Sequence, residues 1–264
     1  MKTFIVPTDF SDTAKNAAQF AVSIAAQNED TQIILYNSFE KKYADRINIM
    51  IEALEELKQE LLIGHGNVQI TCMAEEESSF TTGLERIARH QRADMIIMGI
   101  TGATRLAQLF MGSNTLDMVE KNVCPVMIIP PDAKFTGIKN VVLTSDFKDV
   151  DKTIPVKPLQ SILSLFNPKV YIVNVDSEHY VELTEEYKAE KEKLEVMLEG
   201  YQHEFYFIRI FDFIEAISNF TEDYNIDLIL TVPKNHSFLG SLFRSNATKK
   251  LKYHTHVPLI AIHE

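Results

Sequence analysis

The feature that most constrains the fold of this 264-residue chain is an internal repeat. The segment KTFIVPTDFSD near the start resembles NVVLTSDFKDV, and Asp9 then matches Asp146 at an offset of 137 residues. Further along, ADMIIMG resembles IDLILTV and VCPVMIIP resembles HVPLIAIH, both at an offset of 133. Repeats of this kind indicate two copies of one structural unit. We therefore predict two domains, residues 1–133 and 138–264, joined by the Pro- and Gly-containing segment PPDAKFTGIK.

Each half alternates strand-like and helix-like segments. In the first half, Ser11 can cap a helix whose apolar residues recur at helical spacing. Strands are predicted at FIVPT, IILYNS, NVQITCM, DMIIMG and CPVMII, with later helices near residues 40–63, 82–90 and 114–121. Alternation of this kind favours an α/β fold: two tandem doubly wound, mostly parallel five-stranded sheets with helices on both faces. In the second half, Pro155 and Pro158 interrupt the first helix.

Composition excludes several classes of protein. The formal net charge of −11 would repel nucleic acid and anionic lipid, so we expect neither as a partner. The start, MKTFIVPTDFSD, does not resemble a signal peptide, and the longest apolar runs are too short to span a bilayer. Cys72 and Cys124 have no metal-type spacing, and we predict that both are buried, reduced thiols in a cytoplasmic protein.

Glycine is concentrated in one short segment. The stretch GITGATRLAQLFMGSNT, residues 99–115, holds three of the nine glycines, follows the fourth predicted strand and opens onto a helix. Ligands of doubly wound sheets bind at the carboxyl ends of strands, and a helix N-terminus there attracts anions such as phosphate. Glycine would let the backbone approach a ligand closely. Arg105 is the only basic residue in the stretch, so main-chain groups must supply most of the attraction.

The spacing G-x2-G-x9-G-S, formed by Gly99, Gly102, Gly112 and Ser113, resembles the ATP-binding signature of universal stress proteins. VPTDFSDTA is similar to the first strand and turn of that family, and CPVMIIP to its last strand. The resemblance covers the whole chain, because the family includes tandem two-domain forms. It implies a Rossmann-like, adenine nucleotide alpha hydrolase-like fold and a stress-response regulator or sensor that binds ATP, with Mg²⁺ as a further candidate.

The resemblance also assigns roles to residues of the first half. Asp9 would hold the ribose hydroxyls, Pro7 and Thr8 would shape the adenine pocket, and backbone groups near Asn37 would contact adenine. The predicted nucleotide-binding set is completed by Met98 and Arg105 and by the residues expected along the ribose and phosphates, which are Gly99, Gly102, Gly112, Ser113, Asn114 and Thr115. Contacts to the adenosine part do not depend on the number of phosphates, so ADP, AMP or a cyclic nucleotide could replace ATP.

The second half departs from the signature. At the offset of 133, Val232, Asn235 and Ser245 replace the three glycines, and Asn246 replaces Ser113. Side chains then stand where phosphates would pass, so we predict a degenerate domain that does not bind ATP as the family does. The basic segment PKNHSFLGSLFRSNATKKLK could bind a different anion, form a solvated helix face or pack on the first domain.

Other chemistry is less well supported by the sequence. The run Tyr253-His254-Thr255-His256 invites a metal site, but no cysteine or second close pair completes a ligand set. The acidic run Glu75–Glu77 could hold Mg²⁺ near the phosphates or form a solvated loop.

No Ser-His-Asp order, nucleophile elbow or general acid–base pair is evident, so binding is favoured over catalysis. A slow ATPase and a scaffold that binds no nucleotide are the alternatives. By resemblance, the two domains would pair through Val126–Ile129 and Leu259–Ile262, and association into a homodimer is left open.

Overall fold

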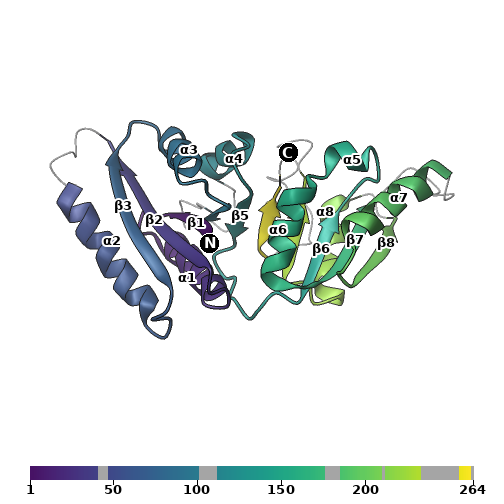
Figure 1. The fold of residues 1–264 in the computed structure, drawn as a ribbon, viewed down its shortest axis with the longest axis horizontal. Coiled ribbons are helices and arrows are strands. Elements are labelled where there is room, and N and C mark those ends of the chain that lie inside the picture. The colour runs from purple at the N-terminus through teal and green to yellow at the C-terminus, as the bar shows by residue number, and fades with distance from the viewer. Residues whose placement is uncertain (41–46, 101–111, 176–184, 210–211, 233–255, 263–264) are drawn as a thin grey trace. The chain divides into compact units, whose positions relative to one another are not determined.

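The structure is a computed structural model and describes residues 1–40, 47–100, 112–175, 185–209, 212–232 and 256–262. It divides into two compact units, Met1–Phe135 and Thr136–Glu264 (Figure 1). Each unit contains a parallel sheet of five strands, and the predicted α/β class with tandem doubly wound sheets is confirmed.

The first unit follows the predicted alternation of strands and helices. Its sheet has the strand order β3-β2-β1-β4-β5, with every pairing parallel. The strands are β1 (Lys2–Pro7), β2 (Thr31–Phe39), β3 (Gln69–Glu76), β4 (Met95–Gly99) and β5 (Val126–Ile129). The helices are α1 (Asp12–Ala25), α2 (Ile47–Leu62), α3 (Phe80–His90) and α4 (Ser113–Glu120). Helices α1 and α2 contact each other, as do α3 and α4, so each pair shares a face of the sheet.

Helix α1 forms as the sequence predicts. The side chain of Ser11 accepts a hydrogen bond from the Ala14 backbone N–H, which satisfies one of the donors that the first turn leaves open. The predicted apolar face is buried, and it consists of Ala14, Ala17, Ala18, Ala21, Ile24 and Ala25. Of the second predicted helix, Glu40 is not helical, residues 41–46 lie outside the described residues, and α2 covers Ile47–Leu62.

The second unit repeats the order with one change in its first helix. Its sheet order is β10-β9-β6-β7-β8, again parallel. The strands are β6 (Asn140–Thr144), β7 (Lys169–Val175), β8 (His203–Ile208), β9 (Leu228–Thr231) and β10 (Leu259–Ala261). The helices are α5 (Val150–Thr153), α6 (Val156–Phe166), α7 (Glu185–Met197) and α8 (Phe213–Asp223).

The predicted interruption of the first helix lies at Pro155 alone. Helix α5 ends before Ile154 and Pro155, and α6 starts directly after them. Pro158 lies in the first turn of α6, where its missing N–H is not needed, so it does not break the helix as expected.

Alternation along β8 shows that helices cover both faces of the second sheet. Phe207 contacts Tyr187 of α7, with ring centroids 5.6 Å apart. The neighbouring Tyr206 contacts Phe220 of α8 instead, at 5.1 Å. Successive side chains of a strand point to opposite faces, so α7 and α8 lie on opposite sides of the sheet.

A carboxylate clasp recurs at the amino end of both sheets. In the first unit, Asp94 Oδ2 accepts from the Thr3 backbone N–H at 2.7 Å, and the Asp94 N–H donates to the Thr3 carbonyl at 2.9 Å. In the second, Asp227 and Asn140 form the same pair of bonds at 2.9 and 2.8 Å. The clasp ties the start of the first strand to the loop before the fourth, which fixes the register of two strands that are remote in sequence.

The two cysteines are only partly buried, so the expectation of buried thiols is wrong in degree. Cys72 lies on β3, an edge strand of the sheet of the first unit with few buried positions, and Cys124 precedes β5. Loss of hydration nevertheless raises the pKa of each thiol to about 12, and at Cys72 the neighbouring Glu55 carboxylate adds to this effect.

We predict that both thiols react slowly in the native protein. A thiol with a pKa near 12 holds far less reactive thiolate at pH 8 than one with the ordinary value. The reaction with Ellman's reagent should therefore be at least about tenfold slower in the native chain than in guanidinium-unfolded protein, because the lower thiolate fraction outweighs the higher nucleophilicity of each thiolate. Equal rates in the two states would contradict the prediction.

Candidate functional site

A cavity of about 170 Å³ lies at the carboxyl ends of β1, β2 and β4 in the first unit. This is where doubly wound sheets bind ligands. Seven residues of the predicted nucleotide-binding set line it: Pro7, Thr8, Asp9, Asn37, Met98, Gly99 and Asn114. The structure therefore brings most of the predicted set together around one space.

The turn after β1 holds Asp9 by its own backbone. The Asp9 Oδ1 atom accepts from the Ser11 backbone N–H at 3.0 Å, and the Phe10 N–H donates to Thr8 Oγ1 at 3.0 Å. Phe10 has a φ of +63°, a left-handed conformation that is uncommon for a bulky residue. The turn thus directs an exposed carboxylate to the cavity through a strained backbone.

Asn37 is fixed at the end of β2 and is only 8% exposed. Its Nδ2 donates to the Thr8 carbonyl at 2.8 Å, and the Thr8 N–H donates to the Tyr36 carbonyl at 2.9 Å. The Asn37 Oδ1 atom is buried and has no hydrogen-bond partner among the described residues. A buried acceptor without a donor is unfavourable, so this atom is a candidate contact for a ligand.

Gly99 also has a packing role that the sequence did not predict. A Cβ at this position would lie 2.5 Å from the Thr13 carbonyl oxygen and 3.3 Å from the Ala14 nitrogen. The close approach of α1 to the end of β4 therefore requires glycine here. The same approach places Thr13 and Ala14 on the cavity wall.

Helix α4 presents its N-terminus beside the cavity. Gly112 is the N-cap residue, and no side chain caps the helix. Asn114 lines the cavity, whereas Thr115 is fully buried and does not. The Thr115 backbone N–H donates to the Gly112 carbonyl at 3.1 Å. The other N–H groups in the first turn of a helix generally have no partner in the helix backbone.

Some of the predicted positions lie outside the described residues. They are Gly102 and Arg105 of the first half, and Asn235, Ser245 and Asn246 of the second. His254, one of the two histidines considered for a metal site, is also outside. Within the described ranges, no three His, Cys, Asp or Glu side chains are grouped to hold a metal ion.

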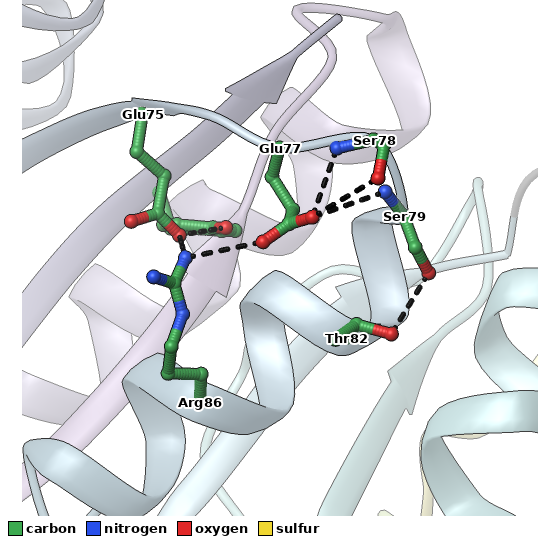
Figure 2. Close-up of polar contacts among 7 residues, drawn as sticks. Glu75, Glu77, Ser78, Ser79, Thr82 and Arg86 are labelled. Carbon is green, nitrogen blue, oxygen red and sulfur yellow. Dashed lines mark hydrogen bonds and ion pairs between the residues drawn. The ribbon is translucent and has the colours of Figure 1, made fainter.

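The acidic run at the end of β3 is paired with an arginine. Figure 2 shows the Arg86 guanidinium between two carboxylates, 2.7 Å from Glu75 Oε1 and 3.3 Å from Glu77 Oε2. Glu75 Oε1 also accepts from the Tyr36 hydroxyl at 2.6 Å, and burial together with this bond raises the pKa of Tyr36. The acidic run therefore takes part in a network of ion pairs and hydrogen bonds within the protein. This network favours a structural role for the run over a magnesium site.

Glu77 also fixes the start of α3. Its Oε1 accepts from the backbone N–H groups of Ser79 and Ser78, at 3.4 and 2.9 Å, and these bonds hold the pKa of Glu77 below its ordinary value (Figure 2). The next residue, Phe80, lines the cavity. The network thus determines where one apolar wall of the cavity stands.

Sequence reasoning missed four lining residues, Thr13, Ala14, Ser38 and Phe80. Ser38 follows Asn37 at the end of β2, so its neighbour could have indicated it. Ala14 was assigned only to the apolar face of α1, and Thr13 was assigned no role. Phe80 depends on the carboxylate network, which no local pattern predicts.

Residues 1–130 match the profile of the universal stress protein family. The chain belongs to this family. A universal stress protein of Methanocaldococcus jannaschii is 28% identical over 146 residues, which cover 50% of this chain and 84% of the relative. One from Thermus aquaticus is 24% identical over 141 residues, covering 48% and 98%.

The solved structures extend the likeness in fold to both halves. A universal stress protein from Archaeoglobus fulgidus superposes with a TM-score of 0.70 at 15% identity, over 98% of this chain and 97% of that one. A functionally unknown protein from Pseudomonas aeruginosa gives a TM-score of 0.60 at 9% identity, over 99% and 92%. In the described part of the chain, no helix has the length and apolar character needed to cross a membrane.

We predict that Gly99→Ala destabilises this universal stress protein. The new methyl group meets backbone atoms of α1, which cannot rotate away, so the free energy of unfolding should fall by about 1–3 kcal/mol. The matched control is Gly66→Ala, because a Cβ there has no neighbour within 4 Å, and its effect should stay within about 0.5 kcal/mol. Urea unfolding of the purified chains measures both. Equal effects of the two changes would contradict the packing argument.

Proposed function

We propose that the first half of this universal stress protein binds an adenine nucleotide, with ATP as the expected form, and serves as a stress-response regulator or sensor. The observation that carries the proposal is the cavity at the carboxyl ends of β1, β2 and β4, which joins Asp9, Asn37 and the start of α4. Its groups suit the base, the ribose and the phosphates in turn.

The base end is formed by Asn37 and apolar neighbours. The Asn37 Oδ1 atom is a buried acceptor with no donor among the described residues, and an amino group on a bound base would satisfy it. Phe80 and Met98 supply apolar surface on the cavity wall. Ligand sites commonly combine such surface with a few fixed polar groups.

The ribose end is formed by Asp9. An ionised carboxylate only accepts hydrogen bonds, and two neighbouring hydroxyls are suitable donors for its two oxygens. The Ser11 N–H holds one of those oxygens in place, so the carboxylate is already oriented.

The phosphate end is formed by the N-terminus of α4. First-turn N–H groups and the helix dipole favour a negative charge, and Asn114 adds a polar side chain there. Mg²⁺, if it accompanies ATP, would be carried by the phosphates, because Glu75 and Glu77 are engaged by Arg86. Binding is favoured over hydrolysis, since Asp9 is the only carboxylate among the described lining residues and its proposed role is to hold the ribose.

We predict about one adenine nucleotide per chain. Small molecules released by denaturing the freshly purified protein would be identified by mass spectrometry, which also reports the number of phosphates. Isothermal calorimetry with ATP would then compare wild type with Asp9→Asn, which should weaken binding by roughly ten- to a hundredfold because a charged acceptor is lost.

Asp12→Asn is the matched control. Asp12 is an exposed acidic residue in the first turn of α1 and does not line the cavity, so this change should leave the affinity within about twofold. A wild-type protein that is isolated empty and also fails to bind ATP, ADP or AMP would overturn the proposal and leave the scaffold alternative.

The pairing of the two domains through Val126–Ile129 and Leu259–Ile262 stays a proposal that rests on the family resemblance. Neither segment contains a charged side chain. Exposed edge strands are commonly protected by charged residues, so uncharged edge strands such as these are better suited to being covered. Analytical ultracentrifugation would establish whether two chains then associate.

A further inference from the structure

The second unit contains its own cavity at the equivalent place. It measures about 290 Å³ and lies at the carboxyl ends of β6, β7 and β9. Three of its polar lining residues, Ser145, Asp146 and Asn174, stand at an offset of 137 from lining residues of the first cavity. Phe213 and Val232 stand at an offset of 133 from two others. Val232, which replaces Gly99, leaves this cavity open.

The turn that presents the carboxylate is also built in the same way. Phe147 has a φ of +54°, and its N–H donates to Ser145 Oγ at 3.1 Å. Asp146 Oδ1 accepts from the Lys148 N–H at 3.2 Å, and Asn174 Nδ2 donates to the Ser145 carbonyl at 3.0 Å. A left-handed bulky residue is unfavourable unless its surroundings impose it. The second turn therefore has the specific geometry of the first and is not a relaxed loop.

The packing around the cavity has changed in a coordinated way. Gly99 of the first unit is replaced by Val232, whose side chain could not fit against a helix in the position of α1. In the second unit the corresponding helix is broken at Ile154 and Pro155, and Thr153 and Ile154 line the cavity. The wall has been rebuilt around the valine, and the cavity is larger than the first.

The chemistry of the lining has changed as well. Thr231 stands where the first cavity has Met98, and Thr144 where it has Pro7, so two hydroxyls replace apolar groups, and their Oγ1 atoms lie 3.0 Å apart. Within the described residues the lining includes no lysine or arginine, while Asp146 contributes a negative charge. These groups suit a neutral ligand rich in hydroxyls better than a phosphorylated one.

We propose that the second cavity is a separate site for a neutral ribonucleoside, with its ribose hydroxyls on Asp146 and its base against Phe213. A carboxylate accepts from both hydroxyls of a vicinal diol, and the aromatic ring offers a surface for a planar base. The choice of ligand class rests on the proposed function of the first cavity. The chain would then bind two related metabolites, a nucleotide in the first half and the corresponding nucleoside in the second.

Equilibrium dialysis with labelled adenosine tests the proposal on the full chain. Saturating ATP occupies the first cavity, and one adenosine per chain should remain bound. Asp146→Asn should weaken this binding at least tenfold, through loss of a charged acceptor. Val175→Phe should do the same by filling the cavity from β7. The matched control is Asp149→Asn, an exposed residue that does not line the cavity and whose left-handed backbone suits asparagine, and it should change the affinity less than twofold.

Several results would overturn the second site. They are absence of adenosine binding beside ATP, binding that persists in both Asp146→Asn and Val175→Phe, and two ATP molecules per chain. Thermal unfolding followed by circular dichroism verifies that the variants fold.

Failure of the proposed function gives a different pattern. If ATP does not bind, adenosine is titrated into Asp9→Asn alone and into Asp9→Asn combined with Asp146→Asn. One adenosine per chain in the former, lost in the latter, supports the second site even though the first proposal has failed. The same weak or absent binding in both variants overturns the second site too.

Discussion

The close approach of the first helix to the end of the fourth strand is the contact on which the first site depends. With no Cβ at Gly99, the backbone of Thr13 and Ala14 can pack directly on β4. Helix α1 therefore begins beside the carboxyl ends of the strands, and its first turn forms one wall of the cavity. In the second unit Val232 stands at the corresponding position, and the helix after the first strand is interrupted at Ile154 and Pro155. The two units thus combine a different residue after the fourth strand with a different start of the helix.

The turn between the first strand and its helix is the other element that the two units share. In both, an aspartate is held by a backbone N–H two residues later, and the phenylalanine after it is left-handed. In this arrangement a backbone N–H of the same turn orients the carboxylate. A site whose polar anchor is set locally can keep that anchor while the rest of its lining changes.

Much of the fold could be predicted from the sequence, because repeat and periodicity are local or additive signals. The offset between Asp9 and Asp146 revealed two units, and Ser11 with its apolar periodicity placed α1. Seven of the eleven lining residues of the first cavity could be predicted as well, since residues at the carboxyl ends of parallel strands must converge.

The remainder depends on contacts between elements that no local pattern encodes. The reason for Gly99 lies in the backbone of another element, and the burial of Thr115 depends on how α4 packs. Arg86 pairs with Glu75 across the turn that joins β3 to α3, so the acidic run looked solvated in the sequence and is balanced in the structure. The wall formed by Phe80 follows from that pairing. Such features appear only once helices and strands are placed against each other.

The carboxylate clasp has a consequence for how the chain is made. Thr3 and Asp94 are 91 residues apart, and Asn140 and Asp227 are 87 apart, so each clasp closes only when most of its own unit is present. Neither clasp involves the other unit. The first unit can therefore complete its sheet while the second is still being synthesised, and its apolar strands need not wait, exposed, for the rest of the protein. Because of the duplication, the clasp contacts of this long chain are formed within each half and do not span the whole sequence.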